Sequence, residues 1–389
     1  MVFKTYKMND MKGKQGLVCM GLLLVLSSCS CHTGKQITAS GLQRKDFQTE
    51  VNGQHTDLFT LSNKQGMEVC ITNYGARVVS ILVPDRNGKR EDVVCGFSTI
   101  TEYMEQRQNF GSTVGRYIGR ILNARFTLDG VEYKLVPNNG KSGHISHGGN
   151  PGFADRIWKV EQADTHRVRL SYLSPDGENG FPGNLKVTLV YSLGEDDNAL
   201  DLTYEATTDA PTVLNLSHHS FFNISGNFTK SVEDQQLWVD ADRFTPYDDK
   251  KCVTGEYLPV AGTPLDFRMP HTIGECIDAD HPQLKVVNGY DHTWELNTKG
   301  DDTRPAAWVY DPASGRKMEI FTTEPGMQIY TGNGLKGKMT GKGGIAYPFR
   351  SAVCFETMHF QDSPNQPEFP STVLRPGEVF RSHTVYKFE

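Results

Sequence analysis

The sequence predicts an all-β protein, built as a large antiparallel β-sandwich. From Phe47 onward, short runs of apolar and β-branched residues alternate with turns rich in Gly, Pro, Asn and Asp. Helical periodicity is confined to one short stretch, residues 100–107. Many short strands separated by frequent turns are typical of two packed antiparallel sheets.

Two hairpins and a series of single strands make up the expected sheets. Residues 58–61 and 67–72 flank a turn that ends in Gly66, which adopts positive φ without strain. Residues 121–128 and 131–136 flank Asp129-Gly130, the strongest hairpin signal in the chain. Further strands are expected at residues 77–83, 168–173, 185–193, 199–207, 306–310, 318–323 and 327–330.

Composition excludes several classes of protein. The chain has 389 residues, 37% hydrophobic and 22% charged, and no linker interrupts residues 46–389, which we treat as one domain. The formal net charge is −6 and no Lys/Arg run appears, so a nucleic-acid partner is not expected. The cysteines of this domain show neither a disulfide framework nor a CxxC motif: Cys70, Cys95, Cys252, Cys276 and Cys354.

The first 45 residues are a different kind of sequence. Several lysines precede an apolar run, residues 17–26, which is too short to cross a bilayer but suits a signal peptide. Leu26-Ser27-Ser28-Cys29 resembles a bacterial lipobox, so we expect a signal peptide over residues 1–28, a lipid on Cys29 and a polar tether over residues 29–45. The protein would then be exported and lipid-anchored in a bacterial cell envelope. An uncleaved anchor or a simple secretory signal is the alternative.

A strand expected at residues 215–223 carries two adjacent histidines. Because side chains alternate along a strand, His218 and His219 must point to opposite faces. One face carries Leu216, His218, Ser220 and Phe222, and the other carries Asn215, Ser217, His219, Phe221 and Asn223. The second face is mostly polar, as a hydrogen-bonding pocket for a sugar requires, so His219 is the candidate functional residue. The alternative for either histidine is a satisfied, partly buried imidazole.

Another expected strand, residues 351–360, places a carboxylate among apolar side chains. Alternation puts Glu356 on the same face as Ala352, Cys354, Met358 and Phe360. Burial disfavours the charged form of a carboxyl group, which makes Glu356 a stronger base than a solvated glutamate. A buried salt bridge is the alternative to a functional role.

Three loop-like stretches add polar side chains. Residues 115–121 hold Arg116 and Arg120 among glycines, where backbone can approach a ligand closely. His147 is followed by two glycines, and Asp291 comes just after a glycine turn. Taken singly, each stretch is also compatible with an ordinary solvated loop.

A carboxylate base and an imidazole acid on neighbouring strands can move two protons in opposite directions. On a cyclic hemiacetal, Glu356 would take the proton of the anomeric hydroxyl while His219 protonates the ring oxygen. The ring opens to a free aldehyde, rotates about C1–C2 and recloses as the other anomer. His147, Arg120 and Asp291 would hold the sugar hydroxyls, and neither a metal nor an organic cofactor is required.

The order of these motifs resembles that of the aldose 1-epimerase (galactose mutarotase) family, from about Phe47 to the C-terminus. The matching stretches are residues 115–121, 147–153, 215–223, 289–292, 323–333, 354–357 and 362–378. The resemblance implies a galactose-mutarotase-like supersandwich in which Glu356 is the general base and His219 the general acid. It also implies that His147, Asp291 and Arg120 bind the sugar.

Four positions depart from the family pattern. The family has Asn at the position of Gly119, and usually Asn at that of His218. It commonly has Gln where this chain has Met358, and Pro where this chain has Gln361. Loss of the Asn side chain at Gly119 removes one sugar contact, which bears on substrate preference, whereas His218 faces away from the site.

One rival function is a metal-dependent enzyme that uses His144, His147 and the pair His218 and His219. Adjacent strand residues point in opposite directions, so the pair does not chelate one ion. A metal site is therefore not expected.

Two further rivals also take a sugar. A carbohydrate-binding lipoprotein without activity would keep aromatic and arginine side chains, but it need not keep both His219 and Glu356. An epimerase of sugar phosphates would use additional basic groups, for which Arg116 and Arg120 are candidates. A small sugar remains the expected partner, and the expected form is a monomer.

Overall fold

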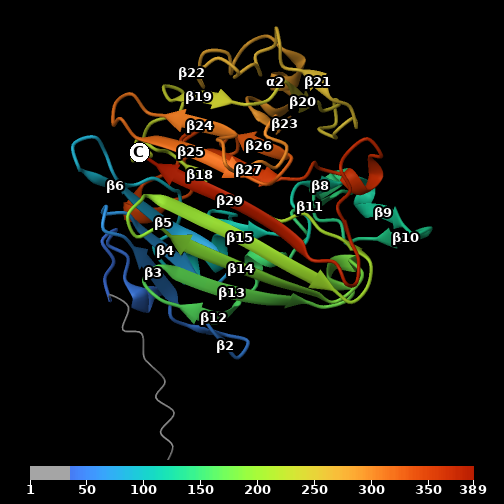
Figure 1. The fold of residues 1–389 in the computed structure, drawn as a ribbon, viewed down its shortest axis with the longest axis horizontal. Helices are drawn as coiled ribbons and strands as arrows, with labels where there is room; N and C mark the ends of the chain where they lie inside the picture. Colours follow the sequence, from blue (N-terminus) through green and yellow to red (C-terminus); the bar gives the residue numbers. More distant parts are fainter. Residues whose placement is uncertain (1–35) are drawn as a thin grey trace, which may run out of the picture. The chain divides into compact units, whose positions relative to one another are not determined.

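The folded body is almost entirely antiparallel β-structure (Figure 1). The computed structural model describes residues 36–389, and within that range it contains two short α-helices, α1 (Ile100–Gln106) and α2 (Pro282–Val287). The predicted all-β class and the short helix near residue 100 are both confirmed. The expected signal peptide and the lipidation site Cys29 lie outside the described residues. No helix in the described range is long and apolar enough to cross a membrane.

The largest sheet has nine antiparallel strands, and its centre is formed by the C-terminal strand β29 between β15 and β25 (Figure 1). Its strands, in spatial order, are β12 (Lys159–Ala163), β13 (Arg167–Ser174), β14 (Leu185–Leu193), β15 (Ala199–Thr208), β29 (Phe380–Phe388), β25 (Lys317–Thr322), β24 (Ala307–Tyr310), β19 (Gln236–Val239) and β22 (His271–Thr272). Along β15 and β29 buried and partly exposed side chains alternate. One face of this sheet therefore covers the core and the other is solvated.

A second sheet has six strands and carries part of the candidate site. Its strands, in spatial order, are β18 (Phe221–Phe222), β27 (Val353–Met358), β26 (Gly326–Tyr330), β23 (Asp291–Glu295), β20 (Arg243–Thr245) and β21 (Leu258–Pro259). Every residue of β27 is buried, and so is every residue of β26 except the last. The central strands of this sheet are therefore covered on both faces.

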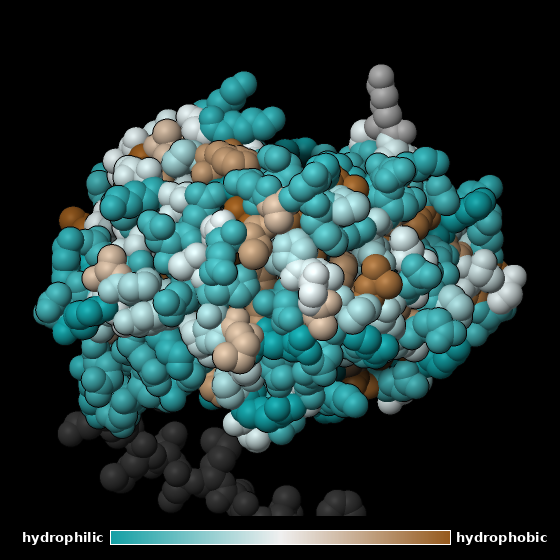
Figure 2. All heavy atoms as spheres, turned by 90° about the horizontal axis from the view of Figure 1, so that it is seen from above, coloured by the Kyte–Doolittle hydropathy of each residue, from teal (hydrophilic) through white to brown (hydrophobic). Residues whose placement is uncertain are grey.

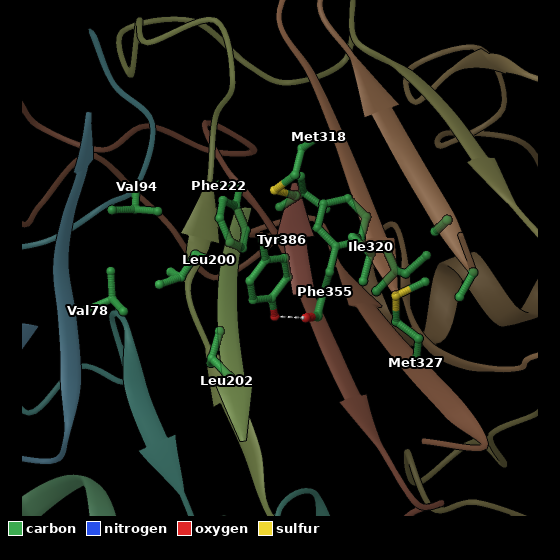
Figure 3. Close-up of a cluster of buried hydrophobic side chains, with 14 of the residues drawn as sticks. Val78, Val94, Leu200, Leu202, Phe222, Met318, Ile320, Met327, Phe355 and Tyr386 are labelled. Atoms are coloured by element: carbon green, nitrogen blue, oxygen red, sulfur yellow. Dashed lines mark hydrogen bonds between the residues drawn. The ribbon is translucent and has the colours of Figure 1, made fainter. Parts of the chain in front are cut away.

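Part of the hydrophobic core lies between these two sheets (Figure 3). Tyr386 of β29 points from the nine-stranded sheet and donates a hydrogen bond from its hydroxyl to the backbone oxygen of Phe355 on β27, at 3.0 Å. Its ring centroid lies 5.1 Å from that of Phe222 on β18. Because a buried hydroxyl without a partner is costly, this bond allows a tyrosine to fill the space between the sheets.

Smaller sheets complete the body. The four-stranded sheet contains β3 (Leu58–Ser62), β4 (Glu68–Thr72), β5 (Arg77–Pro84) and β6 (Arg90–Asp92). The two-stranded ladders are β1 (Glu50–Val51) with β2 (Gln54–His55), β7 (Ser112–Val114) with β17 (Ser217–His219), β8 (Arg120–Ile121) with β11 (Ile145–Ser146), β9 (Arg125–Leu128) with β10 (Val131–Lys134), and β16 (Thr212–Val213) with β28 (Val373–Leu374). Both predicted hairpins are present, as β3–β4 and β9–β10.

Two strands that the sequence predicted as continuous are interrupted. The segment 215–223 divides into β17, which pairs with β7, and β18, which pairs with β27. The segment 121–128 is broken after β8 by a turn in which Asn123 and Ala124 have positive φ. In both cases the strand changes partner, and no local sequence signal marks that change.

The described part of the expected tether packs onto the body. Leu42 is buried, and the backbone N–H groups of Ala39 and Ser40 donate to the Glu68 carboxylate. The folded body therefore includes residues upstream of residue 46.

The face shown in Figure 2 is mostly hydrophilic, with apolar residues scattered singly or in small groups.

Candidate active site

The five residues that the sequence pointed to as a sugar site all line one cavity of about 250 Å³. They are His219, Glu356, His147, Asp291 and Arg120. Clefts for drug-sized ligands measure roughly 300–1,000 Å³, so this cavity suits a ligand of monosaccharide size. The rest of its lining, which the sequence did not single out as site residues, is Gln108, Asn109, Gly119, Ser146, Phe221, Gln328, Tyr330, Met358 and Gln361.

Strand register brings His219 and Glu356 together. Phe221 on β18 pairs with Cys354 on β27, so the strand ending at His219 runs beside the strand that carries Glu356. On β27, Glu356 is opposite Gln328 of β26, and both side chains line the cavity. Pairing on adjacent strands fixes side-chain positions more closely than a loop does.

The imidazole and the carboxylate face each other directly. His219 Nε2 lies 3.3 Å from Glu356 Oε1, and the two side chains are only 7% and 5% exposed. On the other side of the ring, Nδ1 of His219 lies 3.6 Å from the Cys354 sulfur. The Phe221 ring stacks on the imidazole with centroids 5.0 Å apart. His219 is thus held by the Cys354 sulfur and the Phe221 ring while its Nε2 faces the carboxylate.

Burial shifts the two titrations in opposite directions. It raises the pKa of Glu356 well above its ordinary value, and Asp291 adds to this shift while Arg120 opposes it. Burial lowers the pKa of His219 well below its ordinary value, with a smaller contribution from His147. Both shifts disfavour the charged form of each group. Two coupled groups of this kind titrate as a pair.

His218 faces the hydrophobic core, as strand alternation predicted. Its Nε2 lies 2.6 Å from the Ser220 hydroxyl, and its Nδ1 lies 3.4 Å from the Tyr191 hydroxyl. Burial lowers the pKa of His218 to about 3. Because both ring nitrogens have partners in the core, this histidine is structural.

The β8–β11 ladder places Arg120 and His147 on the same wall. Arg120 is opposite Ser146, and the backbone N–H of His147 donates to the Gly119 oxygen at 2.9 Å. Gly148 follows at positive φ, where an added Cβ would lie 2.0 Å from the Gly115 oxygen, so only glycine fits there. Gly148 therefore allows the close approach of two backbone segments.

His147 is neutral, and its hydrogen bonding indicates which nitrogen carries the proton. Burial, aided by Arg120, lowers the pKa of His147 to about 4. The backbone N–H of Gly119 donates to Nδ1 at 3.4 Å, so Nε2 carries the hydrogen. His147 can therefore donate a hydrogen bond to a ligand in the cavity.

Asp291 belongs to a network of amides and hydroxyls. Gln328 donates to Asp291 Oδ1 at 2.6 Å, and its own oxygen accepts from Thr293 at 2.5 Å. Gln361 donates to the Tyr247 hydroxyl at 2.7 Å and to the Gln328 oxygen at 3.3 Å. The sequence signal that could have revealed Gln328 is a glutamine inside an otherwise apolar buried strand.

Arg116, a candidate basic group for the sugar-phosphate alternative, does not line the cavity. It is buried, and its guanidinium donates to the backbone oxygens of residues 174, 175, 182 and 183. Burial lowers the pKa of Arg116 to about 10. Its role is to hold loops together.

The histidines of the metal-dependent alternative do not converge. His144 uses Nδ1 to accept from the backbone N–H of Asn123, and its Nε2 lies 3.2 Å from the Cys252 sulfur. His218 faces the core. A different group, His219, Cys354 and Glu356, places one donor atom of each residue within 4.8 Å of the others.

That second group does not have the geometry of a metal site. Cys354 lies against Nδ1 of His219, whereas Glu356 faces Nε2 of the same ring. A histidine binds an ion through one of its ring nitrogens. Because Cys354 and Glu356 face different nitrogens of His219, they are not placed to bind the same ion together with it. The arrangement fits an imidazole clamped between two protein groups.

Comparisons with known proteins agree on one family. The family model described as "Aldose 1-epimerase" matches residues 57–387, a span that contains every cavity-lining residue. The galactose mutarotase of Sus scrofa is 39% identical over 330 residues, covering 85% of this chain and 93% of that protein. The aldose 1-epimerase of Escherichia coli strain K12 is 36% identical over 339 residues, covering 87% of this chain and 96% of that protein. A solved aldose epimerase homologue from C. elegans is 31% identical with a TM-score of 0.79, covering 86% and 99% of the two chains.

Proposed function

The chain belongs to the aldose 1-epimerase family and interconverts the α and β anomers of free aldoses, and we propose that Glu356 and His219 are its general base and general acid. The observation that carries this assignment is the 3.3 Å approach of His219 Nε2 to Glu356 Oε1 inside a cavity of monosaccharide size. Two oppositely shifted titratable groups in one cavity are the arrangement that acid/base catalysis requires.

The reaction needs two proton transfers and one bond cleavage. The Glu356 carboxylate takes the proton of the anomeric hydroxyl, and the electron pair of that O–H bond forms the C1=O1 double bond. The C1–O5 bond breaks, and the His219 imidazolium gives its proton to O5. Rotation about C1–C2 and the reverse transfers then give the other anomer.

The pair carries one proton before and after ring opening. Before opening, the proton is on His219 and Glu356 is ionised; after opening, Glu356 is protonated and His219 is neutral. Burial raises the pKa of Glu356 and lowers that of His219, so the surroundings favour the neutral pair. The desolvated site therefore stabilises the pair in the form that it adopts with the open-chain aldehyde.

The remaining polar groups of the cavity orient the sugar. His147 donates from Nε2, and Asp291 has one carboxylate oxygen bonded to Gln328 while the other is available to a sugar hydroxyl. Arg120 lies over the Tyr247 ring, 5.9 Å from its centroid, at the edge of the cavity. Orientation by such groups brings the anomeric hydroxyl and the ring oxygen to the base and the acid.

A free aldose fits this cavity better than a sugar phosphate. Arg120 is the one Arg or Lys side chain that lines the cavity among residues 36–389. Burial opposes its charge, but Tyr247 and then Asp291 raise the pKa of Arg120 above its ordinary value. A phosphate recognised there would need further donors with net positive charge.

Polarimetry of freshly dissolved α-galactose and α-glucose tests the activity. Purified protein lacking residues 1–28, without added metal or cofactor, is expected to speed the approach to the equilibrium rotation. A rate equal to buffer for every aldose tried would support a binding module instead. Glu356→Gln is then expected to abolish the acceleration, and full activity in that variant would remove Glu356 from its role.

We further propose that the protein is exported and carries a lipid on Cys29. The support is the sequence alone: lysines, the apolar run at residues 17–26, and the Leu26–Cys29 motif. Expressed in a bacterium fed a labelled fatty acid, the full chain should incorporate label and sediment with membranes. Cys29→Ser should lose both, and Cys31→Ser, as a matched control, should keep both. Label retained in Cys29→Ser would contradict the assignment.

A further inference from the structure

Gly119 and Gln361 lie against each other on the cavity wall. Both line the cavity, and both stand where the family pattern that the motifs resemble implies another residue. Gly119 has a φ of 74°, and Gln361 is buried, only 4% exposed. The two departures therefore occur at one place in the structure, although the positions are far apart in the sequence.

A side chain at position 119 and the present position of Gln361 exclude each other. An added Cβ at Gly119 would lie 2.5 Å from Cγ, 3.0 Å from Cδ and 3.3 Å from Cβ of Gln361. These are atoms along the length of the glutamine side chain, so moving only its amide end would not remove the overlap. Gly119 is thus needed to make room for Gln361.

The Gln361 amide bonds to groups on both sides of the sugar-binding wall. Its Oε1 accepts from the backbone N–H of Arg120 at 3.2 Å. Its Nε2 donates to the Tyr247 hydroxyl at 2.7 Å and to the Gln328 oxygen at 3.3 Å. Gln328 in turn donates to Asp291 at 2.6 Å. One amide therefore connects the backbone of one sugar-binding residue with the side chain that holds another.

We propose that Gln361 is a positioning residue for substrate binding, and that Gly119 and Gln361 act as one coupled pair. The pair sets the positions of Arg120 and Asp291, and hence which sugar hydroxyls the cavity binds well. It does not touch His219 or Glu356, so it acts on binding of the sugar and leaves the proton transfers unchanged. This inference rests on the proposed function.

Steady-state kinetics on galactose and glucose test the role of the amide. Gln361→Met keeps the length of the side chain but removes its donors and acceptor, and we expect KM to rise about three- to tenfold with kcat within about twofold. Gln162→Met, on an exposed strand, is the matched control and should leave both parameters unchanged. Thermal unfolding checks that Gln361→Met remains folded. A wild-type KM in folded Gln361→Met would overturn the proposal.

The coupling is tested by a double-mutant cycle. Asparagine tolerates positive φ, so Gly119→Asn isolates the overlap with Gln361 from backbone strain. We expect Gly119→Asn alone to raise KM more than Gln361→Ala alone does, and the double variant of Gly119→Asn with Gln361→Ala to have a lower KM than Gly119→Asn alone. The ratio of galactose to glucose KM should change in the double variant.

If the factors by which the two substitutions change KM simply multiply in the double variant, the two positions act independently, and the coupling is overturned. If instead the wild-type protein accelerates no aldose, the proposed function fails before this question arises. The two failures are therefore distinguished by the wild-type rate alone.

Discussion

His218 and His219 are neighbours on β17, yet they belong to two different regions of the molecule. In the core region both nitrogens of His218 have hydroxyl partners, Ser220 and Tyr191. The cavity region places His219 across from Glu356, a second titratable group. Burial is nearly the same in the two regions, so it does not identify the functional histidine. The chemical nature of the partner does.

Arg116 and Arg120 repeat this contrast. Arg116 donates to several backbone oxygens in the interior, and a buried guanidinium with fixed acceptors is a structural device. Arg120 lies on the cavity wall near Asp291 and Tyr247. The contrast predicts that substitutions on the core side reduce stability and substitutions on the cavity side reduce activity.

The largest effect is expected for Glu356→Gln. Loss of the general base should lower kcat by about 10²- to 10⁴-fold, because acid/base catalysis typically contributes that much. Polarimetry measures the rate, and Glu161→Gln on an exposed strand is the control. A kcat within tenfold of the wild type would break the contrast, since the cavity would then hold no essential base.

The arginines should separate stability from binding. Arg116→Met leaves several buried carbonyls without a donor and should lower the free energy of unfolding by at least about 3 kcal/mol. Arg120→Met should raise KM about tenfold while leaving the urea midpoint nearly unchanged. Urea unfolding and steady-state kinetics on both variants give the comparison. Equal losses of stability in the two variants would contradict it.

The adjacent histidines provide a smaller and more local test. His218→Ala leaves the buried Ser220 hydroxyl unpaired and should cost about 1–3 kcal/mol of stability, with kcat of the folded protein unchanged. His219→Ala should reverse the pattern, with a large fall in kcat and a smaller change in stability. A fall in kcat for His218→Ala would show that the core-facing side of β17 also serves the reaction.

The smallest effect concerns pH. Because burial raises the pKa of Glu356 above its ordinary value of 4.5, the folded protein binds more protons than the unfolded chain above that pH. The Glu356 contribution to stability is thus complete below pH 4.5 and is lost as pH rises through the folded-state pKa. Glu356→Gln lacks this loss, so its stability relative to the wild type should increase as pH rises above 4.5. Urea unfolding at a series of pH values measures the difference, and a difference independent of pH would contradict it.

Strand alternation predicted the most important features of the site from sequence. It separated His218 from His219 and placed Glu356 among apolar neighbours, and both inferences need only the two-residue period of a strand. The antiparallel class followed from short strands and turn residues in the same way. These are local patterns, which a single sequence contains.

The other features of the site and of the fold depend on contacts between segments that are far apart in the sequence. Arg116 and Arg120 have similar sequence surroundings, and their separation into interior and cavity is decided by carbonyls near residue 180 and by Asp291. The contact between Gly119 and Gln361 joins positions more than two hundred residues apart. The break between β17 and β18 likewise reflects a change of partner strand. No local periodicity encodes such pairings.

The central position of β29 affects how the chain can fold as it is made. Synthesis runs from the N-terminus, so β15 and β25 are complete well before residues 380–388, the strand that separates them, leave the ribosome. Until then, each of these two strands has an unpaired edge, which other chains can join. The nine-stranded sheet can therefore close only once residues 380–388 have emerged, and a nascent chain stalled before them would keep its two halves unpaired.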